Sequence, residues 1–293
     1  MKYYFIINPH SGKRQLGDLE NKIHQACIKR KIPYEILYTK APGDGKRLAK
    51  KISDSEECTV FSVGGDGNLN DVLNGVIVSE NKILGNIPYG SGNDYDRTLR
   101  NYEDQFVLSD VGVINGRYFI NVACLGLDAD VANNLEKTKN KKWIPVSQRY
   151  NASLVYTFTK FKPKKLSLQI GDFQMETEIT IVALGNGQFY GGGYRIAPKA
   201  LIDDGALDIY IVEKMPKPRI LGVLLKLMRG THENSPKVKK YRNERIIVDS
   251  EEVCVFNVDG EKLQGRHFEI SLKKNAVKVF NDRTFIDEIT EDK

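Results

Sequence analysis

The stretch from Thr59 to Ile77 constrains the fold more than any other part of the chain. Residues 59–63 are apolar and β-prone, so they predict a buried strand. From Asn68 onward the apolar residues recur at helical spacing, which predicts a helix with one face toward a core. The turn between them, Gly64-Gly65-Asp66-Gly67, lets a ligand come close to the backbone. A glycine turn that leads into a helix N-terminus is typical of a phosphate site.

Asp66 is an unusual residue in a site for anions. A carboxylate there indicates that a metal ion or a proton transfer is needed, and therefore an enzyme. The turn is not a phosphate loop of the GxxxxGK type, because no lysine follows the last glycine of the turn.

The first hundred residues alternate between predicted strands and helices. Strands are expected at 3–8, 34–39, 59–63 and 82–87. This alternation predicts a three-layer α/β domain with a parallel sheet, which we place at residues 1–116. In such sheets ligands bind outside the carboxyl ends of the strands, where the turns at 8–13, 39, 64–68 and 89–94 would meet.

The pattern changes after about residue 101. Asn115-Gly116 predicts a two-residue hairpin turn between strands 107–114 and 117–124. Further strands are expected at 165–170, 173–184, 207–212, 245–248, 253–258, 268–272 and 276–280, with one late helix at 220–228. Closely spaced strands with little helix predict an antiparallel β-sandwich, placed at 117–280. The tail 281–293 is expected to pack back on the first domain.

The bulk properties are those of a globular protein outside the membrane. The chain has 293 residues, a net charge of +6 and four widely spaced cysteines, which suggest neither a zinc site nor disulfides. No apolar run is long enough for a signal peptide or a membrane span. A cytoplasmic location is expected, and a lipid substrate would be reached from the aqueous side.

Residues 63–70 resemble the glycine-rich signature of the diacylglycerol and sphingosine kinase family, whose bacterial members are soluble lipid kinases, and more loosely that of NAD kinases. Residues 8–13, 89–97, 191–208 and 257–261 match the lipid kinase family in the same order. The turn Tyr89-Gly90-Ser91-Gly92-Asn93-Asp94 is similar to the GT/GS-x-N-D turn of lipid kinases, whereas NAD kinases carry an N-x-G-x-L-G-F-type segment there. The resemblance implies ATP as phosphate donor and a lipid alcohol as acceptor.

The expected nucleotide contacts come from the turns at the sheet edge. Lys13 would neutralise a phosphate and Ser91 would hydrogen-bond one, while Asn93 or Asp94 could instead cap a helix. The full set of candidates is Asn8, Ser11, Gly12, Lys13, Thr39, Gly64, Gly65, Asp66, Gly67, Asn68, Asn70, Ser91, Asn93 and Asp94.

Two acidic turns in the second half could carry the rest of the chemistry. The resemblance makes Glu261 the general base and leaves Asp66 to orient a metal-bound water; the NAD kinase likeness would make Asp66 the base. The lipid kinase resemblance also implies that Asp204, with the backbone carbonyls of Leu201 and Ala206, holds Mg²⁺. Asp203 and Asp208 are further candidates, and without the resemblance the Asp-Asp-Gly sequence would be an ordinary turn.

Basic residues gather in the second half of the chain, at 137–142, 160–165 and 237–245. With Trp143, Phe158 and Phe161 nearby they could face anionic lipid headgroups at the inner face of the membrane. No nucleic-acid recognition motif accompanies them. A sheet edge of the second domain could pair with a copy of itself in a homodimer.

Three hypotheses follow from the sequence. The first is an ATP- and Mg²⁺-dependent lipid kinase in which the α/β half holds the nucleotide and the β-rich half holds the lipid, with a cleft between them. The second is an NAD kinase-like enzyme on a soluble nucleotide. The third is a non-catalytic, nucleotide-dependent membrane-binding module.

Overall fold

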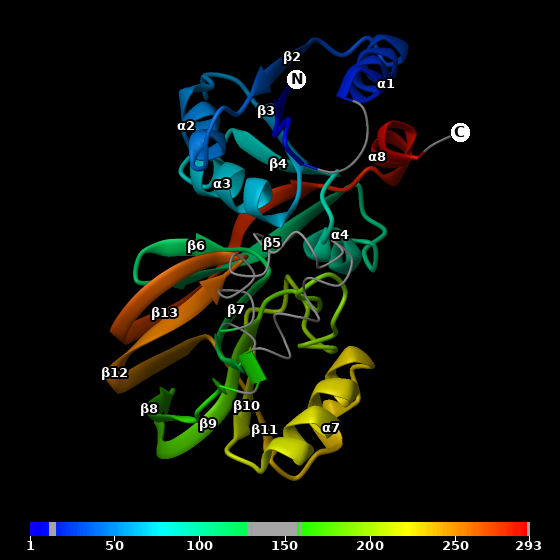
Figure 1. Ribbon diagram of the computed structural model, residues 1–293. Coiled ribbons are helices and arrows are strands. Elements are labelled where there is room, and N and C mark those ends of the chain that lie inside the picture. Colours follow the sequence, from blue (N-terminus) through cyan, green and yellow to red (C-terminus); the bar gives the residue numbers. More distant parts are fainter. Residues whose placement is uncertain (12–15, 128–129, 131–156, 159, 292–293) are drawn as a thin grey trace. The chain divides into compact units, whose positions relative to one another are not determined.

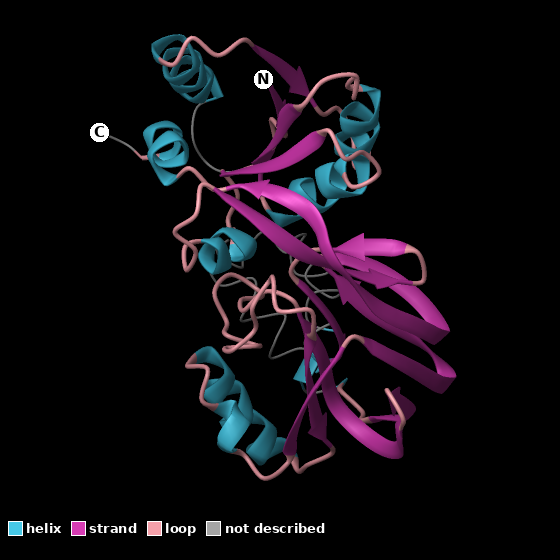
Figure 2. Ribbon diagram, turned by 180° about the vertical axis from the view of Figure 1, so that it is seen from behind, coloured by secondary structure: helices cyan, strands magenta, loops and turns pink. Residues whose placement is uncertain are grey.

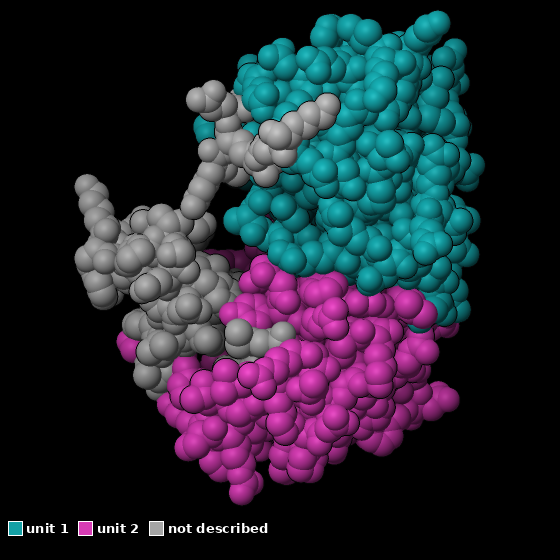
Figure 3. All heavy atoms as spheres, turned by 90° about the vertical axis from the view of Figure 1, so that its right-hand side faces the viewer, with its two compact units in different colours: residues 1–111, 202–204, 273–293 teal, residues 112–201, 205–272 magenta. Residues whose placement is uncertain are grey.

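The computed structural model describes residues 1–11, 16–127, 130, 157–158 and 160–291. The chain forms two compact units, drawn in separate colours in Figure 3. Unit 1 comprises Met1–Val111, Ile202–Asp204 and Lys273–Lys293, and unit 2 comprises Gly112–Leu201 and Gly205–Leu272. The predicted boundaries at 116/117 and 280/281 therefore differ from the observed division at both ends of the second domain.

Unit 1 is built on parallel strand pairs. Its strands are β1 (Lys2–Ile7), β2 (Tyr34–Tyr38), β3 (Cys58–Gly64) and β4 (Lys82–Pro88), in the order β4-β3-β1-β2. Each of these pairs is parallel. Every residue of β3 is buried, as expected for a central strand that is covered on both faces.

Helices lie on both faces of the unit 1 sheet. In both ribbon views α1 (Leu16–Lys29) and α8 (Arg283–Thr290) lie on one face, and α2 (Asp44–Lys51) and α3 (Asp66–Val76) lie on the other (Figures 1 and 2). The short helix α4 (Asp94–Leu99) follows β4. Helices α2 and α3 pack closely because Gly75 leaves room for Ala49, whose Cβ would lie 2.6 Å from a Cβ at position 75.

The C-terminal end of the chain completes unit 1. Residues 268–272 and 276–280, predicted as separate strands, belong to one strand, β13 (Glu261–Phe280). The end of β13 pairs in parallel with β4, with Val279 opposite Leu84. This pairing explains why residues 273–280 join unit 1 rather than the β-rich part of the chain, and it leads α8 onto the sheet.

An aromatic cluster fixes the tail to the sheet. Phe5 and Phe61 stack with their ring centroids 4.8 Å apart, and Phe280 meets Phe61 edge-on at 5.1 Å. The ring centroid of Phe285, a buried residue of α8, lies 5.5 Å from that of Tyr3 and 5.6 Å from that of Phe61. The tail 281–291 is thus part of the core of unit 1.

We expect Phe285→Ala to destabilise the protein by about 3 kcal/mol, because it removes a buried ring and leaves a cavity. Urea unfolding would measure the loss. Val78→Ala, at an exposed position of the same unit, should change the free energy of unfolding by less than about 0.5 kcal/mol. Equal effects of the two changes would show that α8 does not dock on the sheet.

Unit 2 is built on antiparallel pairs. Strand β5 (Phe106–Ile114) begins in unit 1 and enters unit 2 at Gly112. The other strands of unit 2 besides β13 are β6 (Arg117–Phe119), β7 (Val122–Gly126), β8 (Lys164–Ile170), β9 (Phe173–Gly185), β10 (Leu207–Glu213), β11 (Val238–Asn243) and β12 (Arg245–Val258). Strands β7, β8 and β10 each pair antiparallel with β9, and β12 pairs antiparallel with β7, β8 and β13. The one long helix described in this unit is α7 (Lys217–Met228), followed by the 3₁₀ turn η2 (His232–Asn234).

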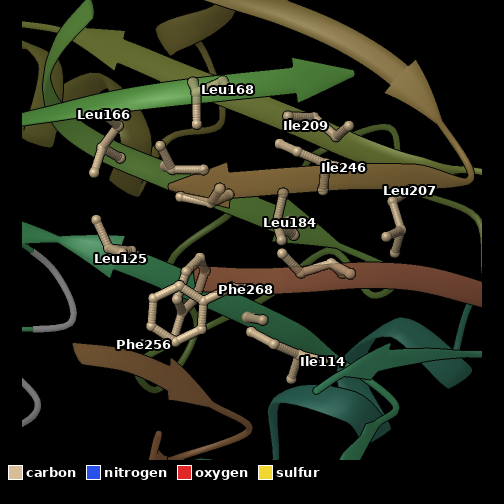
Figure 4. Packing of buried hydrophobic residues seen from close by; sticks show 14 of the residues in the cluster. Ile114, Leu125, Leu166, Leu168, Leu184, Leu207, Ile209, Ile246, Phe256 and Phe268 are labelled. Carbon is tan, nitrogen blue, oxygen red and sulfur yellow. The ribbon is translucent and has the colours of Figure 1, made fainter. Parts of the chain in front are cut away.

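The sheet of unit 2 buries alternate residues on opposite faces. One face contributes Leu184, Ile209 and Ile246 to a core that also holds Phe256 and Phe268 (Figure 4). The other face is covered by α7 and by the loop after β9. The residues of that second core include Val122, Cys124, Ala183, Tyr190, Ile196, Tyr210, Val212, Ile220, Val223 and Leu227.

Several boundaries differ from the sequence prediction. The Asn115-Gly116 turn is confirmed, with φ of 46° and 80° and Ile114 opposite Arg117. The predicted strand 117–124 is two strands, because the Asp259 carboxylate binds the backbone N–H groups of residues 120–122. The predicted strands 245–248 and 253–258 are one strand, β12, with an irregularity between Asp249 and Cys254.

Strand β11 is absent from the prediction, because its residues are mostly charged and show no apolar alternation. The α/β class of the N-terminal part and the β-rich class of the C-terminal part are confirmed. The four cysteines are buried and form no disulfide.

Candidate active site

The turn between β3 and α3 presents backbone rather than side chains. Gly65 is the N-cap of α3 and has no side chain to bind the first turn of the helix. The first backbone bond of the helix runs from Leu69 N–H to the Gly65 carbonyl, at 3.1 Å. Apart from its chain neighbours and the backbone of α3, no described atom lies within 4 Å of the position that a Cβ of Gly67 would occupy. The turn is therefore open at Gly67, at the end of the helix where backbone N–H groups attract anions.

The turns after β3 and β4 touch through glycines. A Cβ on Gly90 would lie 2.3 Å from the Gly65 Cα, and a Cβ on Gly92 would lie 2.7 Å from Asp66 Oδ2. Tyr89 N–H donates to the Gly64 carbonyl at 2.9 Å. Residues with side chains would force the two turns apart, so these glycines hold the predicted binding segments together at one edge of the sheet.

Asp66 has a structural partner that the sequence did not indicate. Its Oδ1 accepts a hydrogen bond from the backbone N–H of Asp94 at 2.8 Å, and Tyr95 N–H lies at 3.5 Å. The carboxylate thus caps α4 from 28 residues earlier in the chain. Because one oxygen is committed to α4, any role toward a ligand falls to the negative charge and Oδ2.

Asn93 does not cap α4, contrary to one of the two alternatives from the sequence. It adopts a left-handed conformation with φ of 55°, and its side chain makes no cap hydrogen bond. Instead Asn93 Oδ1 accepts from Gly90 N–H, and Nδ2 donates to the Gly90 carbonyl, both at 3.0 Å. Asp94 is buried at the start of α4 and lies 3.8 Å from Arg97. Ser91, between these residues, is exposed.

Asn68 and Asn70 are held inside the unit. Asn68 Nδ2 donates to Ser62 Oγ at 2.8 Å and to the Ile6 carbonyl at 3.1 Å, which ties α3 to β1 and β3. Asn70 is only 2% exposed; its backbone carbonyl accepts from Asn74 Nδ2 at 2.9 Å, and its side-chain Oδ1 accepts from the same Nδ2 at 3.3 Å. The Asn68 side chain thus fixes the start of α3, whereas Asn70 bonds within the helix.

The turn after β1 reaches the same edge. Asn8 N–H donates to the Val63 carbonyl at 3.0 Å, and Ser11 Oγ lies 3.2 Å from where a Cβ of Gly64 would stand. Thr39 N–H donates to the Ile7 carbonyl at 2.9 Å, and the Thr39 side chain is buried. Gly12 and Lys13 lie outside the described residues. Asn8, Ser11, Thr39, the Gly64–Gly67 turn and Ser91 are therefore gathered at the carboxyl ends of the strands.

Glu261 begins β13 in unit 2 and is exposed. It is paired with Val258 across a turn in which Asp259 and Gly260 have φ of 47° and 95°. Asp259 is buried, and its carboxylate accepts backbone N–H groups of Ile120, Asn121 and Val122 at 2.8–3.1 Å. Sequence reasoning treated Asp259 only as part of an acidic turn. Its position before a turn glycine, between two apolar strands, was the one available signal of this anchoring role.

The candidate magnesium turn, residues 201–206, contains two carboxylates, Asp203 and Asp204, among backbone carbonyls. Gly205 has φ of 74°, and Leu201 is exposed. Asp203 accepts a hydrogen bond from the Tyr102 hydroxyl at 3.1 Å, and burial raises the pKa of Tyr102 to about 12. The structure therefore commits Asp203 to another partner. Within the described residues no three or more His, Cys, Asp or Glu side chains gather around a metal position.

Asp208, the other spare magnesium candidate, is buried in an ion pair. Lys240 lies 2.8 Å from Asp208 and 3.1 Å from Glu233, and Lys199 lies 2.8 Å from Glu233. Lys237 and Lys239 both contact Glu213, at 3.1 and 2.6 Å. The basic run at 237–245 is thus largely neutralised on β11, which weakens the prediction that it faces lipid headgroups. The run at 137–142, with Trp143, lies outside the described residues.

Glu233 should make stability sensitive to acid. Burial acts against its charged form, but hydrogen bonds from Lys199, Tyr210 and Lys240 outweigh burial and lower the pKa of Glu233 from 4.5 to about 2. A depressed carboxyl pKa stabilises the fold above the unfolded-state value, and that contribution is lost as the pH falls from 4.5 toward 2. Glu233→Gln should therefore flatten the fall in melting temperature between these values.

Thermal unfolding across this pH range tests the assignment. Glu176→Gln, which removes an exposed partner of Lys165, should leave the acid dependence as it is in the parent protein. A parallel acid dependence in Glu233→Gln and the parent protein would contradict the assignment.

A glycine turn at a helix N-terminus is a common phosphate-binding arrangement in proteins, and in this chain further turns meet it at the same edge of the sheet. Two family descriptions match the chain in series. Residues 2–114 match the diacylglycerol kinase catalytic domain, and residues 121–281 match the YegS C-terminal NAD kinase beta sandwich-like domain. The chain belongs to the diacylglycerol kinase family of lipid kinases and is a kinase enzyme.

Individual relatives agree over the whole length. A diacylglycerol kinase of Staphylococcus epidermidis is 30% identical over 316 residues, which cover 98% of each chain. A diacylglycerol kinase of Bacillus subtilis is 27% identical over 94% of this chain and 98% of its own. A crystal structure of a diacylglycerol kinase from Bacillus anthracis has a TM-score of 0.71 at 20% identity over 97% of this chain and 98% of that chain, a likeness of fold alone. Among the described residues, no helix is long and apolar enough to cross a membrane.

Proposed function

We propose that this protein transfers the γ-phosphate of ATP to the hydroxyl of diacylglycerol or a related lipid, in a Mg²⁺-dependent reaction. It would act in the cytoplasm as a peripheral protein at the inner face of the membrane. The observation that carries the proposal is the glycine turn at the start of α3, which is open at Gly67 and packs at Gly65 against Gly90, next to the exposed Ser91.

The nucleotide phosphates would lie against this edge of unit 1. Backbone N–H groups at the start of α3 and the Ser91 hydroxyl would donate hydrogen bonds to phosphate oxygens, while Asn8 and Ser11 border the same turn. Asn68 and Asn93 would act by holding the turns in place, since their side chains bind neighbouring backbone and side-chain groups, while the Asn70 side chain accepts from Asn74 within α3. Phosphoryl transfer depends mainly on such positioning and on charge stabilisation.

The acceptor needs a base for its proton. In the proposed reaction the lipid hydroxyl oxygen forms a bond to the γ-phosphorus, the bond to the β,γ-bridging oxygen breaks, and ADP leaves. Glu261 takes the hydroxyl proton, because it is an exposed carboxylate on the rigid turn that Asp259 fixes. Asp66 would keep its negative charge beside the phosphates and orient a water there.

The turn 201–206 would hold Mg²⁺ through Asp204 and the backbone carbonyls of Leu201 and Ala206. An oxygen-only set with one carboxylate suits this ion, which keeps several waters. Bound Mg²⁺ would supply positive charge; the assigned residues of this chain would orient it.

Phosphorylation assays with one acceptor at a time test the proposal. The full-length protein is incubated with γ-labelled ATP·Mg²⁺ and, separately, diacylglycerol, phosphatidylglycerol, a sphingoid base or NAD. Label in an organic-phase product is expected with at least one lipid and none with NAD. Labelled NADP would instead support the NAD kinase-like alternative, which the description of the C-terminal domain keeps in view. Transfer to none of the acceptors would contradict the proposed activity.

A further inference from the structure

Helix α7 has an apolar outer face. Its inner face, with Ile220, Val223 and Leu227, packs into the second core of unit 2. On the opposite side Leu221 and Leu225, one turn apart, are 52% and 55% exposed. A surface helix in water normally turns polar residues outward, whereas α7 has leucines at the centre of its solvent face. The helix lies alongside β10 and β11 in Figures 1 and 2.

The charged residues of α7 and of the residue that follows it are all positive. Between Glu213 and Glu233 the sequence contains no acidic residue, while Lys217, Arg219, Lys226 and Arg229 lie on or next to α7. Around the helix axis, successive residues turn by about 100°, which places Lys217 and Arg229 on either side of the two leucines and Arg219 nearer the inner face. Within the described part of the chain, no ion pair to Arg219 or Arg229 is found.

The lysines of the neighbouring edge strand behave differently. Lys237, just before β11, and Lys239 and Lys240 on β11 are each within 3.1 Å of an acidic oxygen. Their charge is therefore largely balanced within unit 2, whereas that of α7 is not. The unbalanced positive charge and the exposed leucines coincide on one helix.

We propose that α7 docks the enzyme on the membrane: Leu221 and Leu225 insert among lipid acyl chains, and the surrounding cations bind anionic headgroups. An apolar stripe flanked by Lys and Arg is the pattern of an interfacial helix, and each cation near an anionic surface adds to the attraction. The occupant is thus an anionic bilayer surface rather than an acidic protein, since the leucines need an apolar medium. Because this inference rests on the proposed lipid kinase activity, its test must separate docking from catalysis.

Vesicle sedimentation of the full-length protein measures docking. With vesicles of phosphatidylglycerol and phosphatidylcholine, Leu221→Ser/Leu225→Ser should weaken binding by at least about 30-fold, since two partly buried leucine side chains are lost. The matched control, Leu108→Ser/Val253→Ser, removes two equally exposed apolar side chains elsewhere and should bind as the parent does. Similar loss in both double variants would overturn the inference.

The cations are tested in the same assay. Arg219→Gln/Arg229→Gln should weaken binding to phosphatidylglycerol vesicles by about tenfold and reduce its salt dependence. Lys237→Gln/Lys239→Gln, which removes two lysines paired with Glu213, should have less than a twofold effect. Equal effects of the two pairs would show that general positive charge, and not α7, attracts the membrane.

Activity on two physical forms of substrate separates the claims. Leu221→Ser/Leu225→Ser should lose phosphorylation of long-chain diacylglycerol in vesicles but keep its rate on dispersed short-chain diacylglycerol. Loss of vesicle binding in a protein that phosphorylates no lipid would uphold docking and contradict the proposed function. Unchanged vesicle binding together with a smaller particle mass in light scattering would overturn docking, because α7 would then cover a second copy of the chain.

Discussion

Glu261→Gln should lower kcat for lipid phosphorylation by about 10²–10⁴-fold, because the amide cannot accept the proton of the attacking hydroxyl. Binding of ATP should change by less than about twofold, since the nucleotide contacts are assigned to unit 1. The melting temperature should also be retained, because Glu261 is exposed and its turn is fixed by Asp259. Steady-state kinetics, ATP titration and thermal unfolding measure the three quantities.

Glu252→Gln is the matched control for this change. Glu252 is an exposed carboxylate on β12, the strand that forms a hairpin with β13, and its substitution should leave kcat within about twofold. A fall in kcat of less than about tenfold for Glu261→Gln would assign the base elsewhere. A sharp drop in melting temperature would instead mean that the side chain supports the turn.

Asp66 should separate anchoring from chemistry when it is replaced in two ways. Asp66→Asn retains an oxygen that can accept from the Asp94 N–H, so the free energy of unfolding should fall by no more than about 0.5–1 kcal/mol. The lost negative charge should nevertheless lower kcat by at least about 100-fold, if a water beside the phosphates depends on it. Asp66→Ala removes both functions and should lose a further 1–2 kcal/mol or so.

Urea unfolding and kcat, measured on both variants, distinguish the roles. Asn93→Ala serves as the control for the turn, because the Asn93 side chain accepts a hydrogen bond from the Gly90 N–H, donates one to the Gly90 carbonyl and carries no charge. Full activity in Asp66→Asn would show that Asp66 only caps α4. In that case its role would be that of a positioning residue.

The α/β first part and the β-rich second part follow from short-range patterns. Helical spacing after Asn68 and the turn at Asn115-Gly116 are local signals, and both are found in the structure. Residues 273–280 belong to unit 1 because of a long-range contact, the pairing of Val279 with Leu84. The charged edge strand β11 carries no apolar alternation, so no pattern could indicate it.

The candidate site, like the fold, has features that local sequence patterns predict and features that depend on contacts between distant residues. Glycines at 64, 65, 67, 90 and 92 were predicted as binding turns, and the structure brings these turns together. The partners of individual side chains were not predictable, because Asp66 caps a helix 28 residues later and Asp259 binds backbone more than 130 residues earlier. The ion pairs of the lysines at 237–240 were not predictable from the sequence, because their acidic partners lie on other elements, β10 and η2.

Transfer of γ-labelled phosphate from ATP into a mixed bacterial lipid extract, with the product identified by mass spectrometry, tests the central claim most directly. The account predicts one labelled lipid whose mass exceeds that of its precursor by a phosphate, formed by the parent protein and lost in Glu261→Gln. Label that stays in the aqueous phase, or a labelled lipid formed equally by Glu261→Gln, would contradict it.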